Sequence, residues 1–331
     1  MTKVLVIGAS GQLGAVVLDR LLATSRECVA FVRPASGFIP PASAQVKIVR
    51  GDLADFASVD NACVGVKKVI ATASSIVPRL GDKFGSDEVG HYRNLIKACR
   101  RHAVEHLVYI SAFSSPYDKQ VPEFRIKRQI EQLIVESGIS FTIFRAAAFM
   151  DVYYAVLGSR LATTGVSHPT LLRGFWLTKF YARATSGWLE KYGIALVPGS
   201  GKARHNFICI DDVATFMVKA LTMPSAKNRL IELGGPQALS WREVVDIYAQ
   251  VLNKKVIKLS MPGFILNFWR LALRPFSPAG ENIMSLLSLL GRYDAVMDMA
   301  AISAEFAIRL TDTRGFLLAK IKADRSAYKK S

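Results

Sequence analysis

Cysteine is scarce in this chain, and its few cysteines lie far apart. The 331 residues include only Cys28, Cys63, Cys99 and Cys209, none of them in a Cys-X-X-Cys pair. Such spacing argues against a disulfide framework and against a zinc site, and it fits a reducing compartment. Met1 leads directly into a strand-like segment, so we expect no secretory signal peptide. These absences favour a cytoplasmic protein.

Long uninterrupted apolar runs are also missing. Hydrophobic residues make up 51% of the chain, which is enough for a sizeable core. No window approaches the roughly 20 apolar residues that a membrane-spanning helix needs. The most apolar candidate, residues 261–273, is short and contains Arg270. We therefore expect no transmembrane helix.

Acidic residues are few compared with basic ones. Asp and Glu number 26 against 43 Lys and Arg, which gives a formal net charge of +17. A basic chain attracts anionic partners such as nucleic acid, lipid headgroups or an acidic protein, and a plainly solvated basic surface is the alternative. No RNA-recognition, helix-turn-helix or zinc-finger pattern is present, so nucleic acid is not the expected partner.

Short β-branched runs alternate with helix-like stretches through the first half of the chain. Continuous apolar runs of this kind suit strands of a parallel sheet that is covered on both faces. Right-handed crossovers then predict an α/β fold with a doubly wound parallel sheet, the Rossmann arrangement. The predicted strands are 3–7, 28–33, 46–50, 68–72, 107–111 and 140–144, and the predicted helices are 12–24, 55–64, 84–102 and 122–137.

The second half has a looser pattern. We expect a nucleotide-binding Rossmann domain over residues 1–150 and a smaller, mostly helical C-terminal substrate lobe over 151–331. Residues 207–233, with a strand near 207–210 and another at 229–233, are expected to return to the Rossmann sheet. A capping box at Ser240 and Glu243 opens a further helix, and residues 255–260 resemble a last strand.

Residues 4–14, VLVIGASGQLG, place three glycines between the first predicted strand and the first predicted helix. Gly8 permits the tight turn, Gly11 lets the backbone approach a pyrophosphate, and Gly14 lets the helix pack closely on the sheet. The start of the helix then holds the phosphates through its free N–H groups. A purely structural turn is the alternative, but the strand before and the helix after favour a dinucleotide site. The cofactor contacts expected from this loop are Gly8, Ser10, Gly11, Gln12, Leu13 and Gly14.

The residues that follow the second strand favour NADP(H) over NAD(H). An NAD site usually has Asp or Glu there, bonded to the ribose 2′-OH. This chain has Arg33, whose guanidinium can pair with a 2′-phosphate; a solvent-facing Arg33 is the alternative. Asp52 and Leu53 after the third strand, and Ala73 after the fourth, are further expected cofactor contacts. Asp52 also fits a turn or a helix cap.

These segments together resemble a known superfamily. GASGQLG, FVRP, GDL, YISAFSS and KRQIEQLIVESGISFTIFRAAAF are similar to the short-chain dehydrogenase/reductases, and more narrowly to their atypical NmrA-like branch. The resemblance covers about residues 3–260. That branch includes isoflavone-reductase-like enzymes, divinyl chlorophyllide reductases, the NADPH-binding accessory subunit of respiratory complex I and photosystem II assembly factors. The resemblance implies the fold and the cofactor class more specifically than the substrate.

The resemblance also implies a catalytic Tyr four residues before a catalytic Lys. Lys127 matches the family's Lys, which bonds the nicotinamide ribose and lowers the pKa of the Tyr; an exposed helical lysine is the alternative. The Tyr position holds Glu123. Glu123 acts as an acid if burial raises its pKa, or else it complements the helix dipole. Tyr117 reaches the site only if its loop folds back.

Two further positions are implied by the same resemblance. Ser111, at the end of the fifth predicted strand, matches the region of the family's catalytic Ser, with Ser114 and Ser115 as rivals. A serine there also fits a structural role at a strand end. Phe149 lies where the family lines the nicotinamide pocket.

Two functions from different classes fit these residues. The first is an NADPH-dependent reductase of an apolar small molecule. The second is a non-catalytic NADP(H)-bound accessory factor, assembly factor or redox sensor at a membrane protein complex, peripheral on the inner face of the membrane. Aromatic residues interleaved with basic ones suit an anionic membrane surface, a lid, a protein interface or an ordinary core-covering helix. They occur in residues 171–192, which include Arg173, and in 261–276, and basic residues continue in the tail, 309–331, with Lys329 and Lys330.

Overall fold

The computed structural model describes residues 3–24, 26–39, 45–74, 87–166, 168–172 and 175–328. Residues 84–86 of one predicted helix lie outside these ranges, as do Arg173, Lys329 and Lys330.

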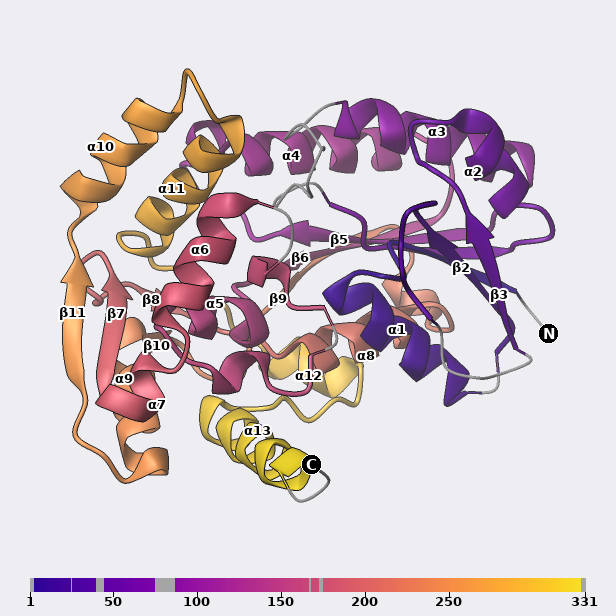
Figure 1. Cartoon of the computed structure of the whole chain (residues 1–331). Coiled ribbons are helices and arrows are strands. Elements are labelled where there is room, and N and C mark those ends of the chain that lie inside the picture. The colour runs from indigo at the N-terminus through magenta and orange to yellow at the C-terminus, as the bar shows by residue number, and fades with distance from the viewer. Residues whose placement is uncertain are drawn as a thin grey trace.

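The larger part of the molecule is a seven-stranded sheet with helices on both faces (Figure 1). Its strands are β1 (Val4–Ile7), β2 (Cys28–Val32), β3 (Val46–Arg50), β4 (Lys68–Ala71), β5 (His106–Ala112), β6 (Phe141–Ala146) and β9 (Arg229–Leu233). Neighbouring strands run parallel in the order β3-β2-β1-β4-β5-β6-β9. The strand order reverses between β1 and β4, which is where such sheets bind ligands. The predicted doubly wound fold is confirmed.

Side chains of the sheet alternate between two helical layers, because successive strand residues point to opposite faces. Val6 and Phe144 pack against one layer, while Leu5 and Tyr109 pack against the other. Figure 1 shows the layers below and above the sheet. The lower layer contains α1 (Gln12–Leu22), α8 (Ile210–Ala220) and α12 (Ala300–Glu305), and the upper layer contains α2 (Phe56–Ala62), α3 (Glu88–Arg101) and α4 (Pro122–Val135).

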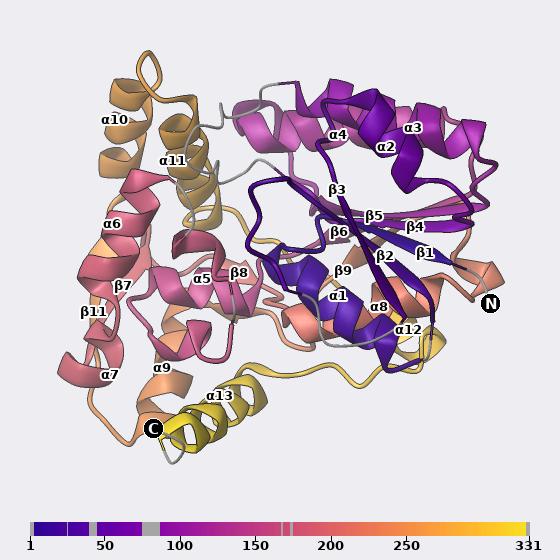
Figure 2. The same ribbon diagram turned by 45° about the vertical axis from the view of Figure 1, so that its right-hand side comes forward.

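A second lobe lies beside the carboxyl ends of the strands (Figure 2). Its core is aromatic, with Tyr154, Phe207, Trp241 and Tyr248 fully buried in one cluster. The capping box predicted at Ser240 and Glu243 is confirmed. The helices of this lobe are α5 (Met150–Val156), α6 (Trp176–Thr185), α7 (Trp188–Tyr192), α9 (Trp241–Leu252), α10 (Gly263–Leu273), α11 (Pro278–Leu290) and α13 (Thr313–Tyr328); its strands are β7 (Ile194–Pro198), β8 (Arg204–His205), β10 (Leu239–Ser240) and β11 (Ile257–Met261).

The strand predicted near 207–210 is wrong. Ile208 makes only one bridge, with Phe149, and α8 begins at Ile210, whose backbone N donates to the Asp151 carboxylate at 2.9 Å. That bond satisfies one of the free backbone N–H groups at the start of α8. The strand beside β6 is β9. The predicted strand at 255–260 corresponds to β11, which pairs with β7 in a separate small sheet. The domain boundary near residue 150 stays a prediction.

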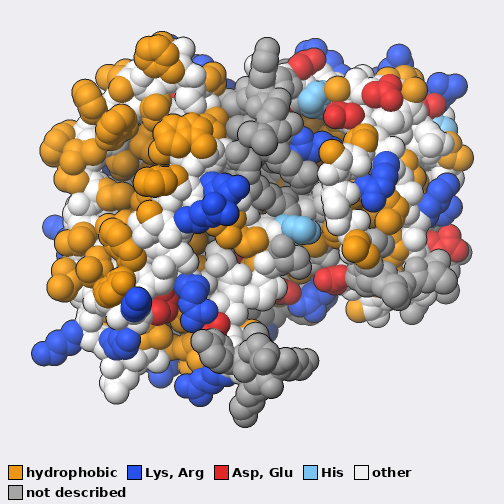
Figure 3. All heavy atoms as spheres, in the orientation of Figure 1, with side chains coloured by type: hydrophobic (Ala, Val, Ile, Leu, Met, Phe, Trp, Pro, Cys, Tyr) orange, Lys and Arg blue, Asp and Glu red, His pale blue; other side chains and the backbone are white. Residues whose placement is uncertain are grey.

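The surface of the second lobe differs from that of the sheet domain. In Figure 3 hydrophobic side chains gather over α6, α10 and β11, at the left of the view.

Candidate cofactor and catalytic site

The glycine loop between β1 and α1 is closely packed on itself. Gly8 has a φ of +81°, a conformation that favours glycine. Gly11 N donates to Gly8 O at 2.7 Å, which closes the turn. A Cβ on Gly14 would lie 2.1 Å from the same carbonyl oxygen. Each glycine therefore has a steric reason to be there, and the loop stays small enough for a ligand to approach its backbone.

The start of α1 has no side-chain cap and no acidic residue in its first turn. A bare helix N-terminus next to a glycine loop can hold a phosphate. The side chain of Gln12 is committed elsewhere. Its Oε1 accepts hydrogen bonds from Thr170 N at 3.0 Å and Thr170 Oγ1 at 2.8 Å. Gln12 thus joins the glycine loop to the segment that leads into α6, and Ser10 and Leu13 are buried beside it.

Two arginines lie at the ends of adjacent strands, β2 and β3. Arg33 follows β2, and Arg50 ends β3 opposite Val32. The Arg50 guanidinium donates to Ser36 O at 2.7 Å and to Pro34 O at 3.4 Å, so it braces the turn that carries Arg33. Sequence reasoning missed Arg50, although its place at a strand end beside Arg33 was the available signal. Residues 33–39 contain no carboxylate that would suit a ribose 2′-OH.

The remaining expected cofactor contacts, Asp52, Leu53 and Ala73, follow strands that end at the same edge of the sheet. Each of them accepts a hydrogen bond from another residue of the chain. Asp52 accepts from Ala54 N at 2.9 Å, which is the turn role given above as its alternative. Leu53 O accepts from Asn94 Nδ2 at 2.9 Å, and Ala73 O accepts from Tyr92 Oη at 2.8 Å.

One face of α4 carries three buried charged residues at four-residue spacing, Glu123, Lys127 and Glu131. Lys127 Nζ lies 3.4 Å from Ile110 O and 5.0 Å from the centroid of the Tyr109 ring. Within the described ranges it forms no ion pair. A buried ammonium group with so few partners is costly, which marks it as a group that binds a ligand rather than an ordinary surface lysine.

Glu123 lies one helical turn before Lys127. Its backbone N donates to Asn282 Oδ1 on α11 at 2.9 Å, while its Oε2 is buried without a hydrogen-bond partner among the residues that the structure describes. Burial raises the pKa of Glu123 to about 7; Lys127 and the side chain of Asn282 oppose the rise, and Glu88 adds to it. At neutral pH this carboxyl therefore exists in both protonation states, as a proton donor requires.

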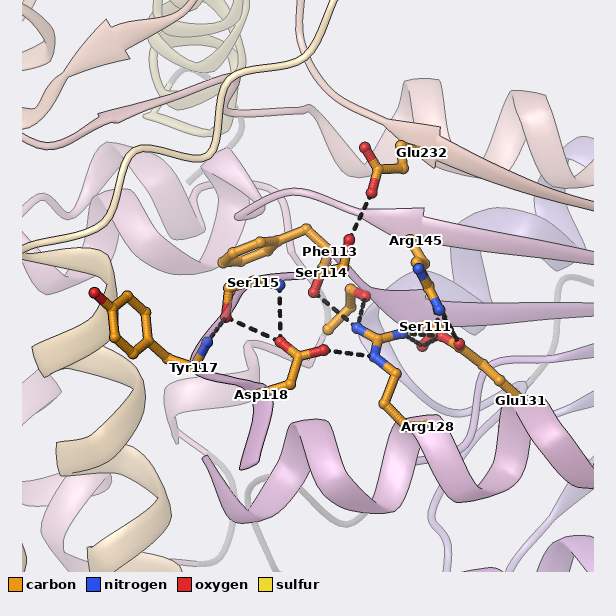
Figure 4. Close-up of polar contacts among 11 residues, drawn as sticks. Ser111, Phe113, Ser114, Ser115, Tyr117, Asp118, Arg128, Glu131, Arg145 and Glu232 are labelled. Atoms are coloured by element: carbon orange, nitrogen blue, oxygen red, sulfur yellow. Dashed lines mark hydrogen bonds and ion pairs between the residues drawn. The ribbon is translucent and has the colours of Figure 1, made fainter. Parts of the chain in front are cut away.

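Ser111 belongs to a polar network on the far part of α4 (Figure 4). Its Oγ donates to Glu131 Oε1 at 2.5 Å. Arg145 pairs with the other oxygen of Glu131 at 2.6 Å, and Arg128 bonds both Glu131 and Asp118. The Ser111 hydroxyl thus ties β5 to α4, and its catalytic role stays a prediction. Of its rivals, Ser114 donates to Glu232 at 2.8 Å and Ser115 to Asp118 at 2.9 Å.

Tyr117 points toward the end of α11. Its ring packs edge-on against Tyr293, with centroids 5.9 Å apart, and lies 4.6 Å from the Arg292 guanidinium. Figure 4 shows the ring directed away from Arg128 and Glu131. No contact in the described parts of the chain brings Tyr117 to Lys127. Phe149 precedes α5 and is partly buried against the core between the sheet and α8.

Comparison with known proteins bears on the family and the fold of this chain. A model of the NmrA-like family matches residues 1–316. The chain is 25% identical over 261 residues to the photosystem II assembly factor Ycf39 of Cyanophora paradoxa, covering 78% of this chain and 71% of that protein. It is 28% identical over 253 residues to the NAD(P)H azoreductase of Xenophilus azovorans, covering 76% and 75%. Its fold matches that of the NADPH-dependent quinone oxidoreductase QOR2 of Escherichia coli, solved with NADPH, with a TM-score of 0.69, 18% identity, and coverage of 96% and 99%.

Proposed function

The chain belongs to the NmrA-like family, and from that premise and the geometry above we propose that it is an NADPH-dependent reductase of an apolar small molecule. The single observation that supports this most is the pair of Lys127 and Glu123. Both are buried on one face of α4, Lys127 has no ion-pair partner among the described residues, and Glu123 keeps an oxygen without a hydrogen bond. Buried polar groups without partners are rare in a finished core, and they are expected where a ligand completes the site.

The residues present fit NADP(H). Backbone N–H groups of the glycine loop and the bare start of α1 suit the pyrophosphate. Arg33, on the turn that Arg50 braces, suits the 2′-phosphate. Lys127 would donate to a ribose hydroxyl. When bound, the cofactor supplies the hydride that the substrate accepts.

Glu123 would supply the proton that completes the two-electron reduction. Its pKa near 7 leaves it protonated in a large share of molecules at neutral pH. Once the proton has left Oε2, the Lys127 ammonium one turn away stabilises the carboxylate. Glu123 would then donate the proton that the catalytic tyrosine donates in short-chain dehydrogenase/reductases with the Tyr and Lys pair.

The names of the relatives suggest acceptors to test. The Xenophilus protein is named for azo reduction and the Escherichia coli protein for quinone reduction. Azo compounds and quinones both carry a conjugated group that takes up a hydride and a proton.

The test uses the purified chain with NADPH or NADH and a panel of quinones and azo dyes. Calorimetry measures cofactor affinity, and the loss of reduced-nicotinamide absorbance measures turnover. We expect Lys127→Ala to lower kcat/KM by at least about a hundredfold, as loss of a positioning and electrostatic group does. Arg125→Ala, an exposed cation on the same helix, is the matched control and should leave both quantities unchanged. Absence of binding of either dinucleotide to the wild-type protein would refute the proposal.

A second candidate function is a non-catalytic NADP(H)-bound accessory factor at a membrane protein complex. The specific observation in its favour is the apolar surface on α6 and α10, which no described part of the chain covers. This function predicts NADPH binding without oxidation by any acceptor in the panel, together with co-purification with a membrane complex. NADPH oxidation that is lost in Lys127→Ala would favour the reductase over this non-catalytic function.

A further inference from the structure

The second lobe exposes large apolar side chains on one side, formed by α6, β11, α10 and the residue Phe276; we call this the α6–α10 face. Figure 3 shows hydrophobic side chains gathered over these elements at the left of the molecule. The most exposed are Phe276 at 87%, Phe264 at 74%, Trp176 and Phe180 at 66%, and Phe268 at 64%. Monomeric soluble proteins rarely expose so many large apolar side chains in one region. The other exposed members are Ile257, Leu259, Ile265, Trp269 and Leu271.

Helix α10 exposes far more apolar surface than it buries. It packs against α11, yet Leu266 is its only buried residue. A helix that served only to cover the core would bury an apolar stripe and expose polar residues. Most of the apolar surface of α10 instead faces away from the described part of the chain.

The helices and the strand of this face, α6, α10 and β11, carry basic residues and no acidic ones, although Lys258 pairs with Asp246 of α9 and Arg274 with Glu281 of α11. Residues 152–189 and 247–280 contain no Asp or Glu. Lys179 and Arg183 on α6, and Arg270 on α10, have no carboxylate partner in the described ranges, and the Nε atom of Arg270 is buried there without a hydrogen bond. Cations placed among exposed aromatic residues without internal counter-charges complement an anionic surface.

We propose that the α6–α10 face docks on a lipid bilayer that contains anionic lipids. Its aromatic and aliphatic side chains would enter the boundary between headgroups and acyl chains, and its Lys and Arg side chains would reach the phosphates. A helix of the 11 residues in α10 is ~16 Å long, about half the thickness of a bilayer core. None of the helices that the structure describes has the length and apolarity to cross a membrane. The face therefore lies on the membrane surface.

A second copy of the chain fits this face less well. A two-fold symmetric contact brings the same surface against itself, so the unpaired cations of the face would oppose each other. The apolar side chains also protrude from separate elements, and fluid lipid adapts to such protrusions more easily than a rigid partner. This proposal is independent of the reductase function.

The test is flotation of the purified full chain with vesicles. One set contains phosphatidylcholine alone, and the other contains equal parts of phosphatidylcholine and phosphatidylglycerol. We expect flotation with the anionic vesicles, and a loss of about tenfold or more in partitioning for the double variant Phe264→Ser, Phe268→Ser. The matched control is Val64→Ser, Val135→Ser, which removes two exposed apolar side chains from the sheet domain and should float like the wild type.

Fluorescence gives a second measurement on the unmodified protein. Brominated acyl chains should quench Trp176 and Trp269 on the face, while the buried Trp241 keeps its emission. NADPH affinity and melting temperature of the double variant verify that it is folded. Three results would overturn the proposal: no flotation of the wild type, equal flotation of the double variant, or a wild-type dimer in gel filtration that the double variant converts to monomer.

Discussion

Replacing Glu123 by glutamine should change how the stability of this protein depends on pH. Glu123 is buried on α4, and burial raises its pKa from an ordinary value of 4.5 to about 7. Glutamine keeps nearly the same shape and can accept the same surroundings, but it does not titrate. The variant Glu123→Gln therefore removes one proton-binding group and little else.

The sign follows from which state holds the proton. The unfolded chain releases it near pH 4.5, whereas the folded protein retains it to about pH 7. Between these values the folded state binds more protons, so the free energy of unfolding falls as pH rises. At about 1.4 kcal/mol for each pH unit, this interval corresponds to about 3 kcal/mol. Above about pH 7 the free energy of unfolding has lost this whole contribution of Glu123, and below about pH 4.5 it has lost none of it.

The assay is urea unfolding of the wild type and of Glu123→Gln at a series of pH values from 4 to 8. Titrating groups that do not interact with Glu123 act equally in both proteins, so the difference in their free energies of unfolding reports on Glu123 together with its neighbours Lys127 and Glu88. We expect the variant to gain about 3 kcal/mol on the wild type across this range. Glu136→Gln, at an exposed position after the same helix, is the control and should show a constant difference. If the difference in free energy of unfolding between the wild type and Glu123→Gln also stays constant across this pH range, the conclusion that the folded protein retains a proton on Glu123 is refuted.

Three further variants test other parts of the site. Gly14→Ala places a Cβ 2.1 Å from Gly8 O and should lower NADPH affinity at least about tenfold in calorimetry, while Gly37→Ala, with open space around it, should not. Arg33→Ala removes charge-assisted hydrogen bonds worth about 1.5–3 kcal/mol, so NADPH binding should weaken by more than about tenfold with NADH binding unchanged. Ser111→Ala removes the hydrogen bond to Glu131 and should cost about 1–2 kcal/mol in urea unfolding; turnover that stays within a few-fold of wild type would assign Ser111 to structure.

Most of the sheet was predictable because its signals are local. β1, β2 and the buried part of β5 are continuous apolar runs, and each is followed by turn residues. The second lobe gave no comparable signal. β7 was missed and Ile208 was misplaced, because a short strand forms or fails according to partners that are distant in sequence. β7 pairs with β11 some sixty residues later, and the stretch around Ile208 is ended by the Asp151 side chain.

The candidate site divides in the same way. The glycine loop was readable because its chemistry is set by three residues within one turn. The burial and the raised pKa of Glu123 could not be predicted from the sequence, because they depend on α11. Its residue Asn282, which contacts Glu123, lies 159 positions away in the chain. The engagement of Ser111 likewise depends on Glu131, Arg145 and Arg128, which come from two other elements. The spacing of residues in the sequence identifies candidate site residues, whereas their hydrogen-bond and ion-pair partners depend on tertiary packing.

The two proposals meet at the hairpin of α10 and α11. α11 presents Asn282 to the backbone of Glu123 on one side and packs against α10 on the other. Packed helices lie about 8–10 Å apart, so roughly one helix layer separates the proposed proton donor from the proposed lipid face. An apolar acceptor concentrates in a bilayer, and a reductase docked by this face would work beside that reservoir. Reductase activity and lipid docking are then compatible properties of one molecule, because the proposed lipid face lies next to the proposed proton donor.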